Sequence, residues 1–176
     1  MNPKSTLSIA GHPIHPMLIP FPVAFFVGTL VTDILHIQSD DPFWPTASNW
    51  LLAAGLVMAA LAALAGLTDF FGDSRIRSLR AAWLHMIGNI ILVLIEAVSL
   101  WRRVLQGPDF IVPTGLALSL IAVALLLFNG WKGWEMVYRH RVGVSEEPAI
   151  RRGEGGGKLP QTPSTGGSML ASIGGA

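Results

Sequence analysis

The feature that most constrains this chain is a set of four apolar segments, each long enough to cross a lipid bilayer as a helix. A helix rises about 1.5 Å per residue, so about 20 apolar residues span the hydrocarbon core. The composition agrees, because 51% of the residues are hydrophobic and only 13% are charged. We therefore expect an all-α integral membrane four-helix bundle, with spans over residues 17–37, 50–69, 81–101 and 114–137.

Three regions follow from this pattern. Residues 1–16 form an N-terminal segment that contains the sequence GHPIHP, and residues 17–138 form the transmembrane domain. Residues 139–176 are rich in Gly, Pro and Ser and have too few apolar residues for a core, so we expect a disordered tail.

Small residues mark one face of the second segment. Gly55, Ala59, Ala62, Ala63 and Gly66 recur at spacings of three, four and seven residues. In lipid, small side chains let two helix backbones approach closely, because packing drives helix association there. We expect this face to contact a neighbouring span.

Basic residues are unevenly divided between the two ends of the spans. One end has only Arg102 and Arg103, with Asp40, Asp41 and Asp109. The positive-inside rule therefore places both termini and the 72–80 loop in the cytoplasm. The end with the termini collects Lys4, Arg75, Arg77, Arg80, Lys132, Arg139, Arg141, Arg151, Arg152 and Lys158.

This topology brings four ionisable side chains to the cytoplasmic level. His12 and His15 precede the first span, Asp69 ends the second, and His85 lies in the second turn of the third. Asn89 lies one turn deeper on the face of His85. We expect this polar stripe to face protein rather than lipid.

A second polar layer is expected near the other end. Asp33 and Glu96 are the seventeenth and sixteenth residues of the first and third spans, and His36 lies one turn beyond Asp33. We expect no buried lysine or arginine to partner these carboxyls. We call the group of His12, His15, Asp69 and His85 the histidine layer. Asn129, deep in the fourth span, is expected to join this layer or to bond a facing helix.

At these residues the chain resembles a family of small bacterial membrane proteins catalogued as domain of unknown function twenty-two thirty-one. The match covers roughly residues 11–137 and rests on GHPIHP followed by LIPFPVAFF, the Gly66-Leu67-Thr68-Asp69 end of the second span, and His85 with Asn89. It implies a four-helix membrane domain in the bacterial inner membrane and brings no established activity. Some relatives are associated with redox partners or haem domains, which slightly favours electron transfer.

A cofactor is our leading hypothesis for the histidine layer. His15 and His85 satisfy the requirement of bis-imidazole haem b for two histidines on different helices at one depth. Alternatively His12, His15, Asp69 and His85 could bind a Zn or Fe ion without thiolate, since the chain has no cysteine. The second and fourth segments contain no histidine, which excludes a pair of stacked haems.

Two further readings stay open. The protein could be a cofactor-free membrane scaffold or anchor that acts through partners, or it could handle protons or ions through Asp33 and Glu96. We expect no stand-alone catalytic activity, because no nucleophile–base pair or phosphate loop is present. The expected partners are the lipid bilayer and a redox or membrane-complex protein, with a homo-oligomer left open. We expect no nucleic-acid partner, because the sequence has no basic patch interleaved with aromatic residues.

Overall fold

The computed structural model describes residues 6–10, 12–39 and 41–144 of the 176-residue chain. These residues all lie within the first of the two units that the chain forms, residues 1–146. The tail expected to be disordered lies, from residue 145 onward, outside the described residues. Its disorder therefore stays a prediction.

The described chain begins with a short hairpin and a short helix. Strands β1 (Ser8–Ile9) and β2 (His12–Pro13) pair antiparallel, with Ile9 opposite His12. Helix α1 (Ile14–Leu18) follows and leads into α2 (Pro20–Gln38). Two of the prolines of this region occupy the first turn of α2, where a missing backbone N–H costs least.

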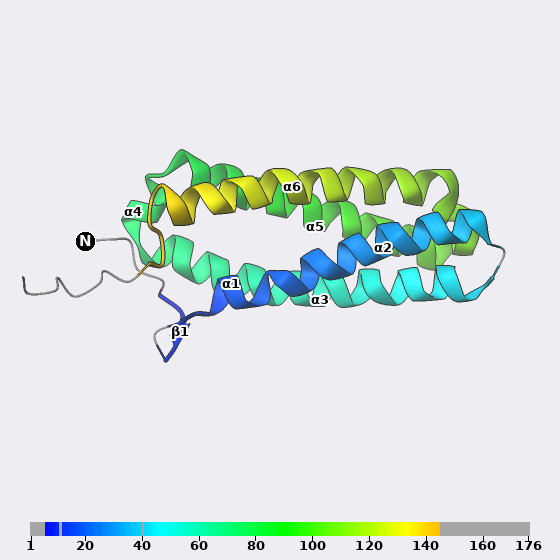
Figure 1. Ribbon diagram of the computed structural model, residues 1–176, viewed down its shortest axis with the longest axis horizontal. Coiled ribbons are helices and arrows are strands. Elements are labelled where there is room, and N and C mark those ends of the chain that lie inside the picture. Colours follow the sequence, from blue (N-terminus) through cyan, green and yellow to red (C-terminus); the bar gives the residue numbers. More distant parts are fainter. Residues whose placement is uncertain (1–5, 11, 40, 145–176) are drawn as a thin grey trace, which may run out of the picture. The chain divides into compact units, whose positions relative to one another are not determined.

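Long helices make up the rest of the described chain. They are α3 (Phe43–Gly72), α5 (Arg80–Gln106) and α6 (Leu116–Tyr138). A single turn, α4 (Ser74–Arg77), links α3 to α5, and two turns, η1 (Gly107–Phe110) and η2 (Ile111–Gly115), link α5 to α6. Helix α2 packs on α3 and α5 packs on α6 (Figure 1).

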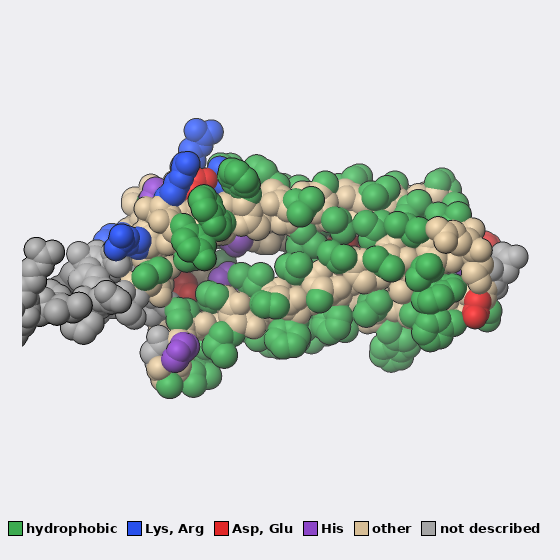
Figure 2. Space-filling model, viewed as in Figure 1, with side chains coloured by type: hydrophobic (Ala, Val, Ile, Leu, Met, Phe, Trp, Pro, Cys, Tyr) green, Lys and Arg blue, Asp and Glu red, His purple; other side chains and the backbone are tan. Residues whose placement is uncertain are grey.

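The core contains at least one residue from each of these long helices. Phe26, Leu52, Ala59, Leu92 and Ala122 form one buried cluster that joins α2, α3, α5 and α6. Large apolar side chains cover the outside of the helices, as the green surface in Figure 2 shows. An apolar exterior of this extent is suited to lipid.

Within the described residues, three helical stretches are long and apolar enough to cross a membrane: Ile14–Gln38, Phe43–Gly72 and Arg80–Tyr138. The third has 59 residues and contains both α5 and α6. It bends at η2, where Val112 has non-helical backbone angles (φ −115°, ψ 122°), and α6 returns alongside α5. The protein is therefore an all-α membrane protein.

Two helices extend beyond their predicted ends. The second apolar segment was expected to begin at Trp50, but α3 begins at Phe43; the third was expected to end at Trp101, but α5 ends at Gln106. The sequence DPFWP reads as a loop because of its prolines, but Pro45 lies in the first helical turn, where proline is tolerated. Both extensions supply residues to a buried polar cluster.

Candidate functional site

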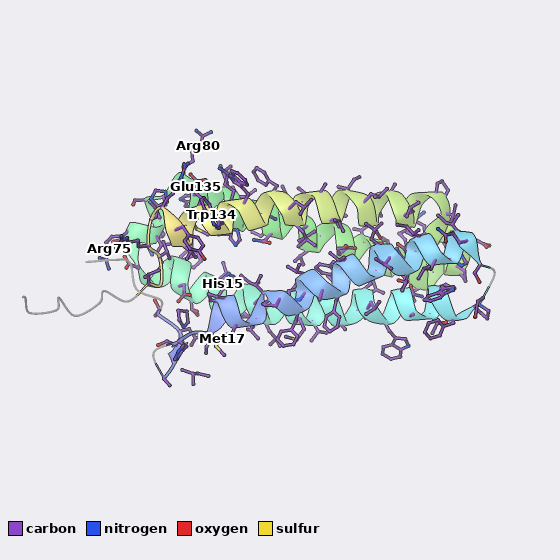
Figure 3. All side chains as sticks on the ribbon, viewed as in Figure 1. His15, Met17, Arg75, Arg80, Trp134 and Glu135 are labelled. Atoms are coloured by element: carbon purple, nitrogen blue, oxygen red, sulfur yellow. The ribbon has the colours of Figure 1, made fainter. Side chains whose placement is uncertain are left out.

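Polar side chains gather at the two ends of the helices. The histidine end comprises α1, the end of α3, the start of α5 and the end of α6. The arginine end comprises the end of α2, the start of α3, the end of α5 and the start of α6. Basic side chains gather at the histidine end (Figures 2 and 3), where Figure 3 labels His15, Arg75 and Arg80.

His15 and His85 meet across the histidine end. Their ring centroids are 6.3 Å apart and their planes are nearly perpendicular, at 87°. His15 Nδ1 lies 2.7 Å from the backbone oxygen of Ala62 on α3, and His85 Nδ1 lies 3.0 Å from that of Asn129 on α6. A carbonyl oxygen only accepts, so each Nδ1 donates, and in a neutral ring the Nε2 then keeps its lone pair.

A glycine makes room for the ring of His15. A Cβ atom at Gly66 would stand 2.9 Å from His15 Cε1, closer than such atoms approach in folded proteins. A Cβ at Gly133 would stand 3.4 Å from His85 Cε1, which is an ordinary contact distance, so His85 does not require a glycine there. Histidine side chains are visible in a hollow between the helix layers in Figure 2. The absence of a side chain at Gly66 therefore shapes the space around the imidazole of His15.

Asn89 and Asn129 surround His85. Asn89 Nδ2 donates to the backbone oxygen of His85, and Asn129 Nδ2 lies 3.4 Å from Asn89 Oδ1. The side chain of Asn129 packs against Gly88, and its buried Oδ1 has no hydrogen-bond partner. Asn129 thus lies in the histidine layer, where the sequence allowed it to be.

The structure does not assemble the four-residue metal set His12, His15, Asp69 and His85. Asp69 Oδ1 accepts hydrogen bonds from the backbone N–H groups of Thr6 (2.6 Å) and Leu7 (3.1 Å), so it holds the N-terminal segment. His12 is exposed on the hairpin, with Nδ1 at 3.0 Å from the oxygen of Ala10. Within residues 6–10, 12–39 and 41–144, no group of three or more His, Cys, Asp or Glu side chains could hold a metal ion.

A buried ion pair lies at the arginine end. Arg103 Nη2 and Asp33 Oδ2 are 2.7 Å apart, Nη1 and Oδ1 are 2.8 Å apart, and both side chains are fully buried. The expectation that the carboxyls would have no buried basic partner is therefore wrong for Asp33. The third span was expected to end at Trp101, but α5 continues through Arg103, whose buried side chain meets a carboxylate that compensates its charge.

Three serines complete this cluster. Ser48 of α3, Ser99 of α5 and Ser119 of α6 are buried and hydrogen-bonded to the ion pair. Sequence reasoning missed them, because a lone serine in a membrane helix is not informative. The spacing of Glu96, Ser99 and Arg103, which puts them on one helix face, was the signal available.

Glu96 is buried beside this cluster. Its side chain has no exposed surface, and neither carboxyl oxygen has a hydrogen-bond partner. His36 lies one turn beyond Asp33 on α2, and its buried Nδ1 also has no partner. Asp33 and Glu96 are thus both buried in the interior.

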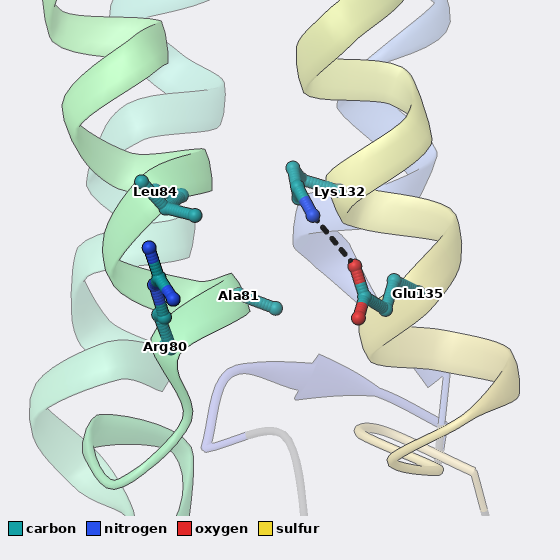
Figure 4. A pocket seen from close by; sticks show the side chains of 5 residues that line it. All are labelled: Arg80, Ala81, Leu84, Lys132 and Glu135. Carbon is teal, nitrogen blue, oxygen red and sulfur yellow. Dashed lines mark hydrogen bonds and ion pairs between the residues drawn. The ribbon is translucent and has the colours of Figure 1, made fainter.

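A pocket of about 340 Å³ opens between α5 and α6 at the histidine end (Figure 4). Arg80, Ala81, Leu84, Lys132 and Glu135 line it, and Lys132 Nζ pairs with Glu135 Oε2 at 2.9 Å. Neither His15 nor His85 lines this pocket, so it is separate from the histidine pair.

Comparisons with known proteins add one match. A family model described as "Predicted membrane protein (DUF2231)" matches residues 11–146, which include every helix described above. No curated protein and no solved structure matches the chain.

Proposed function

This chain belongs to the DUF2231 family of predicted membrane proteins, and we propose that it carries electrons through a haem b held by His15 and His85. The observation that carries the proposal is the meeting of these two imidazoles, from α1 and α5, with both Nε2 atoms left as acceptors. The proposal makes the protein a redox component of its membrane.

The number of protein ligands favours haem over a bare metal ion. A haem would bring its own porphyrin nitrogen donors, so it would need only His15 and His85 from the chain. A zinc site needs three or four protein ligands, and the described residues offer no such group. Two imidazoles on separate helices are therefore a donor set that fits haem b better than Zn.

The separation of the rings is consistent with shared coordination. Coordination of one haem by two histidines would need both rings to lie at one place between their helices. The centroids of His15 and His85 are 6.3 Å apart.

The hydrogen bonds that the two rings make through Nδ1 also support the proposal that His15 and His85 bind a haem. Metal-binding histidines usually donate their other ring N–H to a carbonyl or carboxylate, which fixes the tautomer and orients the ring. His15 and His85 have such acceptors in Ala62 and Asn129. When bound, the haem would supply one-electron chemistry; the chain would orient its ligands through α3 and α6.

We further propose that the chain crosses the bacterial inner membrane four times, with α5 and α6 as separate crossings and both termini in the cytoplasm. Helix α6 packs alongside α5, which supports two crossings within the Arg80–Tyr138 stretch. The burial of Arg103 supports the orientation, because it leaves Arg102 as the remaining exposed basic residue described at the arginine end.

The proposal is tested by absorption spectra of the full-length protein in detergent, oxidised by air and then reduced by dithionite. We expect a Soret band that shifts on reduction, lost in His15→Ala and His85→Ala. The matched controls His12→Ala and His36→Ala should keep it, since neither ring contacts the pair. A wild-type protein without this band, or a band that survives His85→Ala, would leave the pair a packing contact of a cofactor-free scaffold.

A further inference from the structure

The guanidinium of Arg103 has no hydrogen-bond donor to spare. It carries five N–H groups. Nε–H donates to Ser99 Oγ (3.2 Å); Nη1 donates to Asp33 Oδ1 and Ser48 Oγ, both at 2.8 Å; and Nη2 donates to Asp33 Oδ2 (2.7 Å) and Ser119 Oγ (3.3 Å). Every donor of Arg103 is therefore in use.

The carboxylate of Asp33 is satisfied in the same way. Beyond the bonds from Arg103, Oδ1 accepts from the hydroxyl of Ser48 at 2.6 Å, and Oδ2 accepts from that of Ser119 at 2.7 Å. The positive and negative charges cancel, and the network links α2, α3, α5 and α6. This closed network has neither a net charge nor an N–H donor for another carboxyl.

Glu96 lies beside the network without taking part in it. Arg103 of α5 and Asp33 of α2 are the charged groups within its electrostatic reach among the described residues, and they oppose each other. At this end α3 and α6 present the hydroxyls of Ser48 and Ser119, which are already bonded to Asp33. Glu96 therefore has no internal cation of its own.

The free-energy cost of burying a charge determines whether Glu96 is protonated. An isolated carboxylate moved from water into an apolar interior costs several kcal/mol even after relaxation. Both oxygens of Glu96 are buried without a hydrogen bond. A neutral carboxyl avoids this cost, because one proton removes the charge that nothing nearby balances.

We propose that Glu96 is a proton-binding site inside the bilayer, whose carboxylate takes up a proton from water to become an uncharged, exchangeable carboxylic acid. The closed Asp33–Arg103 network maintains this site. Because Arg103 is already fully bonded, it does not form a salt bridge with Glu96 that would stabilise the carboxylate without a proton. Glu96 lies about three turns, or about 16 Å, along α5 from His85. The inference is therefore independent of the haem proposal.

Infrared difference spectroscopy on the full chain in lipid vesicles at neutral pH tests this. We expect the carbonyl stretch of a protonated carboxyl, shifted to lower frequency after exchange into D₂O and absent from Glu96→Gln. The control Glu135→Gln should retain the band, because Glu135 is paired with Lys132 and Arg139. If Glu96→Gln fails to fold, Glu96→Asp keeps a carboxyl and should show a displaced band.

Carbodiimide labelling gives a second readout on the wild-type protein. A lipid-soluble carbodiimide adds to a protonated carboxyl, and peptide mass spectrometry should then locate the adduct on Glu96. Absence of a carboxylic-acid band at neutral pH would overturn the proposal, as would a band that survives Glu96→Gln or does not shift in D₂O. Labelling that spares Glu96 would also contradict it.

Discussion

At the scale of single residues, the molecule handles buried polarity in two ways. Arg103 and Asp33 neutralise each other and satisfy their remaining bonding capacity through three serines. His15 and His85 satisfy one nitrogen each on a backbone carbonyl and keep the other free of the backbone. The first arrangement is closed to a ligand, and the second leaves two lone pairs that a metal ion could accept.

The ion pair predicts a strong asymmetry between single and double substitution. Asp33→Asn should lower the free energy of unfolding by about 3–5 kcal/mol, because Arg103 is left as a buried uncompensated charge. The double variant Asp33→Leu with Arg103→Met should recover most of that loss. Unfolding in denaturing detergent, followed by circular dichroism, measures both. Arg139→Ala is the control, since this exposed residue lies 3.6 Å from Glu135 and should change little. Equal losses in the single and double variants would argue against a compensated pair.

A substitution at Gly66 tests the proposed haem site without removing either proposed histidine ligand. In Gly66→Ala the new Cβ would stand 2.9 Å from His15 Cε1, so the ring must move and its bond to Ala62 weakens. We expect haem occupancy, measured as Soret absorbance per chain, to fall while helix content stays unchanged. Gly130→Ala should keep full occupancy, because nothing lies within 4 Å of its added Cβ. Equal occupancy in the two variants would contradict the role given to Gly66.

At the scale of elements, the apolar segments were predictable, and the polar residues beyond their ends were not. Hydropathy placed the centres of α2, α3, α5 and α6 correctly, since burial in lipid needs continuous apolar runs. It misplaced the start of α3 and the end of α5, where Ser48 and Arg103 lie. Taken one at a time, both residues are typical of loops. They can be buried only because Asp33 lies opposite them, and a single sequence does not reveal that pairing.

At the histidine site, too, the residues within the helices were predictable and the partners outside them were not. The topology brought His15 and His85 to one level, and the structure places their rings together. The predicted topology did not indicate that Asp69 would accept hydrogen bonds from the N-terminal backbone or that His12 would lie on an exposed hairpin. Side-chain partners beyond the helices depend on loop geometry that hydropathy does not contain.

The small-residue face of α3 gives a prediction at this scale. Gly55, Ala59 and Ala62 are buried, whereas Ala63, expected on the same face, is exposed. Ala59→Leu should destabilise the fold by about 1–3 kcal/mol, because the core has no room for the added atoms. Ala60→Leu, at the neighbouring exposed position, should be nearly neutral. Thermal unfolding in detergent compares the two, and a neutral Ala59→Leu would show that this face is not closely packed.

At the scale of the whole molecule, the two polar clusters lie at opposite ends of one set of helices. The proposed redox site is at the histidine end, among the basic residues, and the proposed proton site is at the arginine end. Helix α5 contributes His85 to one and Glu96 to the other. A change at either site could therefore reach the other only through the length of this helix or its neighbours.

Reporter fusions test the proposed crossings. A reporter joined after Trp44 or after Asp109 should report the periplasm, and one joined after Ser78 should report the cytoplasm. The Asp109 fusion distinguishes two crossings by α5 and α6 from one, because it lies in the turn between them. A cytoplasmic signal after Asp109 would refute the four-crossing topology, and inverted signals at all three sites would reverse the orientation.

The haem content of the purified protein tests the central claim most directly. Protein expressed with an ample haem supply, extracted from membranes and assayed as its pyridine haemochrome, should contain haem equimolar with the chain, and the His15→Ala, His85→Ala double variant should contain none. Wild-type protein that folds with full helix content yet carries no haem would contradict the account.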